Sequence, residues 1–228
     1  MEPGFLFAIF AVAAIVIIAF GIVSAARRRE SAATLAARLG LAFHPSDDLG
    51  ITRSPHPIFR MGDRRRASNL LVGTFGDRPV VMFDYEYTVD RRDTDGKQSS
   101  STHRFSGVKV DLAIQCPSTV IRRERIGTKL ANALGLGSDV QFESDAFNRA
   151  FEVRSGSQQF AFTLVDTAMM EWLMANASDL DIQLEPGELV VITRRLPWTE
   201  MEALSVRTHG FIEQFPRLVW SSYGVPGT

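Results

Sequence analysis

Two carboxylates that stand two residues apart are the first candidates for chemistry in this chain. Asp84 and Glu86 lie in the stretch "VVMFDYEYTV", where apolar and polar residues alternate as in a β-strand. Side chains two positions apart on a strand point to the same side, so this pair has the geometry of a general acid and a general base. His103 is a third candidate for proton transfer. Carboxylates that alternate along a strand are more commonly solubilising residues, and we favour that interpretation.

Metal ligands are sparse. The chain has four histidines and one cysteine, and no two histidines have the spacing of metal ligands on a helix. His44 with Asp47 and Asp48 offers suitable donor atoms, but a proline interrupts the stretch, which favours a solvated turn. "DTDG" at 93–96 resembles part of a calcium loop that lacks the closing glutamate. We predict no metal site.

Motifs for cofactors and nucleophiles are equally weak. "GLGSDV" at 135–140 begins like a dinucleotide fingerprint, but Val140 replaces the last glycine and no strand–turn–helix unit surrounds it. No G-x-S-x-G elbow or P-loop is present. Cys116 has no evident base partner and is expected to be a small buried residue. The sequence therefore predicts no catalytic residue and no cofactor, and it favours a non-enzymatic protein.

Arginine dominates the basic residues and is clustered. The clusters are Arg27–Arg29, Arg64–Arg66, Arg91–Arg92, Arg122–Arg123 with Arg125, and Arg194–Arg195. Nucleic acid is not an expected partner, because the formal net charge is only −1. Residues 27–138 carry a net charge of +7 and residues 139–228 a net charge of −7. A basic half next to an anionic membrane would explain this asymmetry, and ordinary solvated surfaces are the alternative.

An uncharged apolar run at residues 4–26, "GFLFAIFAVAAIVIIAFGIVSAA", predicts a transmembrane helix. As a helix it would be about 35 Å long, enough to cross a hydrocarbon core of about 30 Å. A cleaved signal peptide would have a shorter run preceded by positive charge, and a buried soluble helix would show a polar stripe. Arg27, Arg28 and Arg29 follow the run, which predicts a cytoplasmic carboxyl-terminal part and contacts with anionic lipid.

The rest of the chain predicts a juxtamembrane helix and linker at 27–66, then an α+β domain at 67–228. The helix is expected over 31–39, and the linker is rich in Pro, Gly and Asp. Ile58, Phe59 and Met61 leave open that this linker packs on the domain as an arm.

Alternating patterns and turn residues within 67–228 predict locally joined antiparallel strands with interspersed amphipathic helices. Strands are expected in 69–90, with a turn at 76–79, in 103–114, in 119–126, and in hairpins over 149–166 and 180–193; helices are expected around 128–137, 167–178 and 197–215.

The segments "RRASNLLVGTFGDRPVVMFDYEYT", "FESDAFNRAFEVRSGSQQFAFTLVDTAMMEWLM" and "GFIEQFPRLVWSSYG" resemble a family of uncharacterised bacterial membrane-anchored proteins, frequent in actinobacteria. The resemblance covers most of residues 36–224. It implies a bacterial origin and a shared domain, but it supplies no activity and no catalytic residues.

The sequence thus predicts a single-pass protein of the bacterial inner membrane whose cytoplasmic domain is a non-catalytic interaction or scaffold module for an unknown protein partner. One alternative is a membrane-anchored enzyme that uses Asp84, Glu86 and His103. Another is a domain that senses anionic lipid or another ligand. A polar pocket would favour the enzyme, and an exposed apolar patch would favour the scaffold. A basic face at the exit of the anchor would favour the sensing domain.

Overall fold

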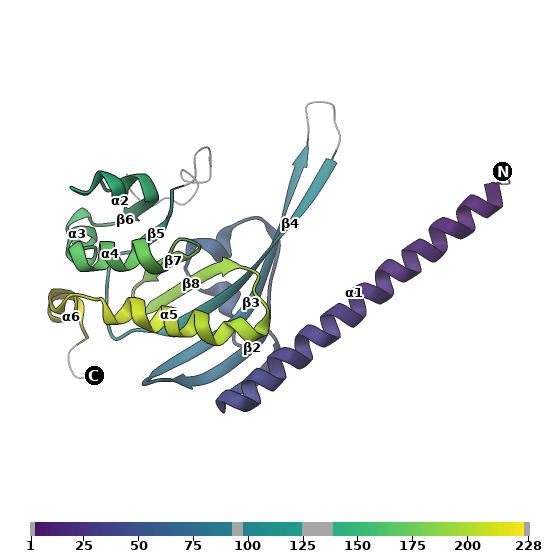
Figure 1. Ribbon diagram of the computed structural model, residues 1–228, viewed down its shortest axis with the longest axis horizontal. Coiled ribbons are helices and arrows are strands. Elements are labelled where there is room, and N and C mark those ends of the chain that lie inside the picture. The colour runs from purple at the N-terminus through teal and green to yellow at the C-terminus, as the bar shows by residue number, and fades with distance from the viewer. Residues whose placement is uncertain (1–2, 93–97, 125–138, 226–228) are drawn as a thin grey trace.

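An eight-stranded antiparallel sheet forms the centre of the protein in the computed structural model, which describes residues 3–92, 98–124 and 139–225 (Figure 1). The side chains of residues 3–11, 13, 14 and 92 are outside this description. The strand order is β1-β2-β3-β4-β8-β7-β5-β6. The strands are β1 (Ala42–Ser46), β2 (Asp63–Phe75), β3 (Arg78–Arg92), β4 (Gln98–Asp111), β5 (Thr119–Arg123), β6 (Phe151–Ser155), β7 (Asp181–Glu185) and β8 (Glu188–Arg194).

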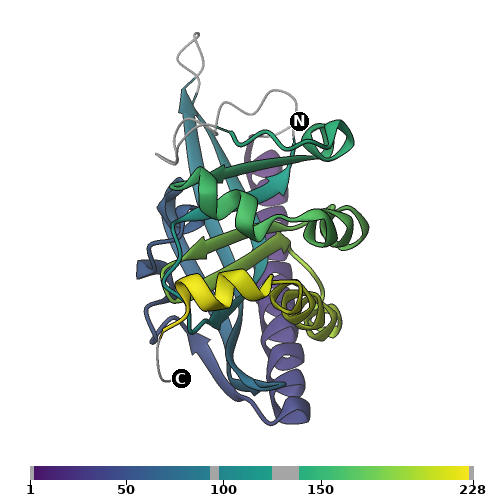
Figure 2. The ribbon, with the colours of Figure 1, turned by 90° about the vertical axis from the view of Figure 1, so that its left-hand side faces the viewer.

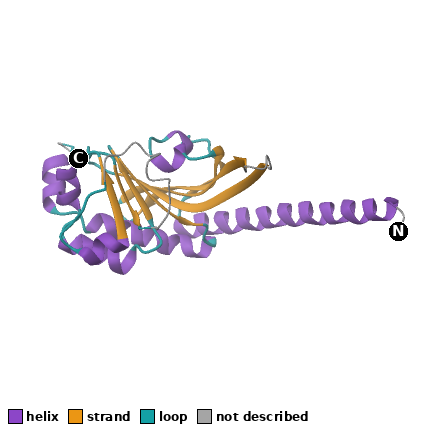
Figure 3. Cartoon of the chain, turned by 90° about the horizontal axis from the view of Figure 1, so that it is seen from above, coloured by secondary structure: helices purple, strands orange, loops and turns teal. Residues whose placement is uncertain are grey.

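Helices cover one face of this sheet, and short helical turns cover part of the other, as the views in Figures 2 and 3 show. The α-helices are α1 (Pro3–Leu39), α2 (Asp145–Ala150), α3 (Gln158–Leu164), α4 (Thr167–Asn176), α5 (Met201–Glu213) and α6 (Arg217–Tyr223). The 3-10 turns are η1 (Ile51–Arg53), η2 (Pro57–Arg60) and η4 (Trp198–Glu200). The predicted α+β class is confirmed.

The side chains of β3 alternate between the two faces of the sheet, as predicted, but an apolar cluster covers each face, whereas one solvated face was expected. Phe83, Tyr85 and Tyr87 pack with Phe59 of η2 on one face of the sheet. Met82 belongs to the larger cluster on the helical face. Asp84 follows Met82 on that same face and is also buried, so the interpretation of this carboxylate as a solubilising residue is wrong. A buried carboxylate needs partners, and the strand alone does not supply them.

Helix α1 runs without a break from the apolar run into the domain, and its last turns pack on the sheet. Ala32, Leu35 and Ala36 are buried in the main core, whereas the amino-terminal half projects away from the domain (Figures 1 and 3). Within the part of the chain that the structure describes, no helix is both long enough and apolar enough to cross a membrane. The side chains of residues 4–11, 13 and 14 lie outside that part. The transmembrane helix at 4–26 therefore stays a prediction.

Three local predictions have different outcomes. The segment between α1 and β2 packs on the domain as an arm, because Ile58 and Phe59 are buried against the sheet. The first strand of the hairpin predicted over 149–166 is confirmed as β6. Its second strand is wrong, since residues 158–164 form helix α3. Ser157 caps this helix by accepting a hydrogen bond from the backbone N–H of Phe160 at 3.3 Å. The helix predicted around 128–137 lies outside the described residues.

Candidate functional site

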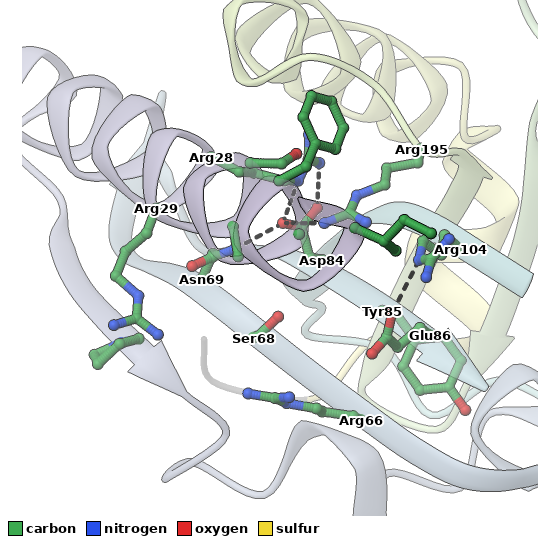
Figure 4. A pocket seen from close by; sticks show the side chains of 16 residues that line it. Arg28, Arg29, Arg66, Ser68, Asn69, Asp84, Tyr85, Glu86, Arg104 and Arg195 are labelled. Carbon is green, nitrogen blue, oxygen red and sulfur yellow. Dashed lines mark hydrogen bonds and ion pairs between the residues drawn. The ribbon is translucent and has the colours of Figure 1, made fainter. Parts of the chain in front are cut away.

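A cleft of about 750 Å³ lies between α1 and the helical face of the sheet, and we refer to it as the α1–sheet cleft. Figure 4 shows its side chains. Helix α1 lines one side, and residues of β1, β2, β3, β4 and the segment after β8 line the other. The lining residues are Ile17, Phe20, Gly21, Ser24, Ala25, Arg28, Arg29, Pro45, Arg66, Ser68, Asn69, Asp84, Tyr85, Glu86, Arg104 and Arg195.

The position of Arg28 follows from the helical repeat of α1. Residues three or four apart share a face of a helix, so Arg28 shares its face with Ala32 and Leu35, which pack in the core. The same face continues toward the amino terminus through Ser24 and Gly21, which line the cleft. The arginine side chain is consequently held against the sheet, with 17% of it exposed. A charge in this position needs a carboxylate partner.

Asp84 supplies that partner. Its carboxylate accepts two hydrogen bonds from the Arg28 guanidinium, one of them from Nε at 2.7 Å. The guanidinium also lies over the ring of Trp198, 5.8 Å from the ring centroid. This pair joins residues 56 positions apart in the sequence and fixes α1 to β3.

A β-bulge in β2 brings a second partner to the Asp84 carboxylate. Ser68 pairs with Asp84 and Leu71 with Met82, so Asn69 and Leu70 together face Phe83. Asn69 has a left-handed backbone with φ of 53°. Its Nδ2 donates a hydrogen bond of 2.9 Å to Asp84 Oδ2. The bulge therefore turns a strand side chain toward the buried charge (Figure 4).

The cleft holds more positive than negative charge. Glu86 pairs with Arg104 at 3.2 Å, and Asp84 pairs with Arg28. Arg195 lies 3.9 Å from Asp84, and burial together with the charge of Arg28 lowers its pKa. Arg29 and Arg66 have no ion pair among the described residues. The arrangement is suited to bind an anion, because guanidinium groups without a carboxylate partner in the described residues line the cavity.

The three residues considered for catalysis are only partly brought together. Asp84 and Glu86 lie on the same face of β3, as predicted, and both line the cleft. Each is engaged by an arginine, so neither is a free base. His103 is stacked on Tyr87 with ring centroids 5.1 Å apart, on the opposite face of the sheet. The roles of Asn69 and Arg195 had no sequence signal, since both depend on the register of distant strands.

The other sequence candidates lie elsewhere. His44 Nδ1 is 2.8 Å from Asp48 Oδ2, and this contact lowers the pKa of Asp48. Asp47 instead accepts hydrogen bonds from the backbone of residues 51 and 52. Among the described residues no group of three or more potential ligands is placed to hold a metal ion. "DTDG" and most of "GLGSDV" lie outside the described residues. Cys116 is buried, which raises its pKa to about 11, so its thiol stays protonated at neutral pH.

Comparison with known proteins shows a likeness in fold. No family model matches the chain, and no curated protein matches it. The crystal structure of the mycobacterial trehalose monomycolate transport factor A, TtfA, is similar with a TM-score of 0.52. The sequences are 16% identical, and the match covers 84% of this chain and 92% of that one. At this identity the likeness concerns the fold alone.

Proposed function

We propose that this chain is a single-pass protein of the bacterial inner membrane whose cytoplasmic α+β domain acts by binding and not by catalysis. The observation that carries the proposal is the exposed apolar surface of α1. Eight large apolar side chains between Val12 and Val23 are 48–75% exposed. The domain does not cover them, and a helix that is apolar on all sides requires another apolar environment. A bilayer would provide it.

A binding role is favoured by the contents of the α1–sheet cleft. The carboxylates of Asp84 and Glu86 already serve as partners of arginines, and His103 is remote from them. The cleft instead offers guanidinium groups at the point where the apolar run of α1 ends. A basic face at the exit of the proposed anchor favours the alternative of a domain that senses anionic lipid or another ligand. TtfA, which has a similar fold, is named a transport factor, and this also supports binding over catalysis.

The proposed anchor is tested by an alkaline carbonate wash of membranes that contain the full chain, followed by flotation to separate membrane-bound protein from aggregate. We expect the wild type to float with the membranes. The double variant Ile15→Arg/Ile18→Arg should be lost from that fraction, because each arginine at a helix centre costs about 2.5–3.5 kcal/mol of insertion free energy.

The matched control is Val206→Arg/Leu218→Arg. Val206 and Leu218 are exposed to a similar degree, 57% and 58%, but they lie on α5 and α6. This variant should float like the wild type. Release of the wild type by carbonate would contradict the anchor, and so would equal release of both variants.

A further inference from the structure

The α1–sheet cleft joins an apolar wall to a basic wall. On the α1 side, Ile17 and Phe20 present hydrocarbon, while Gly21 leaves open space beside the helix. On the sheet side, Arg66 and Arg195 approach the same cavity from β2 and from the residue after β8 (Figure 4). A molecule with an apolar tail and an anionic head would match both walls at once.

The basic wall keeps a net positive charge after the internal ion pairs are formed. Five arginines and two carboxylates line the cleft. Arg28 and Arg104 are engaged by the two carboxylates. Within the described ranges Arg195 has one ion pair, at 3.9 Å, with a carboxylate that Arg28 already holds. Neither Arg29 nor Arg66 pairs with a carboxylate of those ranges. Arg29 and Arg66 therefore remain for an external anion, together with Arg195, whose carboxylate partner is shared with Arg28.

The length of the apolar wall suits a lipid chain. From Ile17 to Arg29 the helix rises by about 18 Å, at about 1.5 Å per residue. Half of a bilayer's hydrocarbon core is about 15 Å. A lipid aligned with α1 would thus place its acyl chains beside Ile17 and Phe20 and its phosphate at the level of the arginines.

We infer that the α1–sheet cleft binds the phosphate head group of an anionic lipid. Arg29, Arg66 and Arg195 are the phosphate-binding residues, since a guanidinium group donates paired hydrogen bonds to phosphate oxygens. The Arg28–Asp84 pair is a positioning element that holds α1 beside the sheet and so keeps the cleft open. This inference rests on the proposed function, because the acyl chains reach the cleft only where α1 lies in a bilayer.

The test measures lipid binding to the full chain in a non-ionic detergent by native mass spectrometry. The probes are dioctanoyl phosphatidylglycerol, dioctanoyl phosphatidylcholine and glycerol 3-phosphate. We expect selective retention of phosphatidylglycerol. The variant Arg66→Gln/Arg195→Gln should bind it about thirtyfold more weakly, as two arginines near an anionic lipid contribute about 1 kcal/mol each.

Two further variants separate the cleft from general surface charge. Arg123→Gln/Arg217→Gln removes the same charge from exposed positions outside the cleft and should bind as the wild type does. Gly21→Trp changes no charge, and a Cβ at this position meets nothing within 4 Å. Its indole should occupy the cleft and weaken phosphatidylglycerol binding.

Three results would overturn the inference. An equal loss of phosphatidylglycerol binding in Arg66→Gln/Arg195→Gln and in Arg123→Gln/Arg217→Gln would show nonspecific attraction to surface charge. Glycerol 3-phosphate binding as tightly as the lipid, with no effect of Gly21→Trp, would assign the cleft to a soluble phosphate. Equal retention of the two lipids would exclude head-group recognition. If the chain floats with membranes but does not prefer phosphatidylglycerol to phosphatidylcholine, this inference alone is contradicted. If carbonate releases the chain from membranes, the proposed function is contradicted.

Discussion

Asp84 illustrates how one buried charge organises its neighbourhood. Only 5% of its side chain is exposed, so the carboxylate depends on Arg28, Asn69 and, more distantly, Arg195. Breaking a buried pair by removing one partner typically costs about 3–5 kcal/mol, because the other charge stays buried. A strand pattern identifies Asp84 as polar but not as buried, since its burial is produced by a helix 56 residues away.

His56 is a second buried polar residue, on the opposite side of the sheet. Its Nδ1 is 2.7 Å from Ser54 Oγ, and Ser54 donates its only hydroxyl proton to Glu188 at 2.8 Å. Nδ1 must therefore carry the proton in the contact with Ser54, which leaves Nε2 as an unprotonated acceptor. Burial is the largest effect and opposes protonation of Nε2. The negative charge of Glu188 favours protonation, and the positive charge of Lys109 opposes it. Together these effects lower the pKa of His56 to about 4.

This depressed pKa predicts a loss of stability in mild acid. The unfolded chain binds a proton at His56 near pH 6.5, whereas the folded chain does so only near pH 4. Stability is therefore fully present above pH 6.5 and falls as the pH decreases toward 4. The full difference corresponds to about 3.5 kcal/mol, at about 1.4 kcal/mol per pKa unit, and about 3 kcal/mol of it is lost by pH 4. Denaturant unfolding of the detergent-solubilised chain at several pH values, followed by tryptophan fluorescence, measures it.

The control for this prediction is His56→Asn, which keeps a donor near the position of Nδ1 and cannot titrate. The variant should be less stable at every pH, but its loss between pH 6.5 and 4 should be smaller than that of the wild type by about 3 kcal/mol. Parallel pH profiles would show that His56 is not the titrating group.

At the scale of elements, the bulge in β2 shows that local backbone conformation serves the cleft. The register shift between Ser68 and Leu71 coincides with the left-handed backbone of Asn69. Asparagine tolerates this conformation better than most residues, and its amide reaches Asp84. A strand drawn from the sequence alone has no such interruption.

Substitution of Asn69 should separate the backbone effect from the hydrogen bond. Asn69→Gly and Asn69→Ala both remove the bond to Asp84, but only alanine also strains the left-handed backbone. We therefore expect Asn69→Ala to be about 1 kcal/mol less stable than Asn69→Gly in denaturant unfolding. Equal stabilities, or a more stable alanine variant, would show that the bulge relaxes once the amide is lost.

A helix or strand could be predicted from the sequence where its buried side chains follow one clear period. In β3 the alternation was clear, because one face of the sheet contacts the arm and the other contacts helices. The strand predicted over residues 158–164 was wrong for a physical reason. Phe160, Phe162 and Leu164 alternate like a strand, but the buried set is Phe160, Ala161 and Leu164, which has helical spacing, and Ser157 caps the helix. An apolar run this short fits either period.

At the scale of the whole molecule, the class of fold could be predicted from the sequence, but the cleft could not. The apolar run and the hairpin signals are local in sequence. The cleft depends on strand order and on α1 packing beside β1 and β2, so it unites residues from 17 to 195. The position of Arg27–Arg29 after the apolar run predicts lipid contacts for all three residues. In the structure Arg28 pairs with Asp84, and Arg27 and Arg29 are exposed.

Topology is the remaining prediction, and it follows from the charges at the two ends of the proposed anchor. Three arginines follow residue 26, against Glu2 on the other side. A reporter fused after Thr228 should therefore be active in the cytoplasm and inactive outside it. The variant Glu2→Arg/Pro3→Arg/Arg27→Gln/Arg29→Gln should shift the chain toward the opposite orientation, because it moves positive charge to the other end while Arg28 is kept for Asp84. Arg123→Gln/Arg217→Gln, far from the anchor, should leave the orientation unchanged. An external signal from the wild-type fusion would contradict the cytoplasmic assignment and would place the α1–sheet cleft at the outer leaflet.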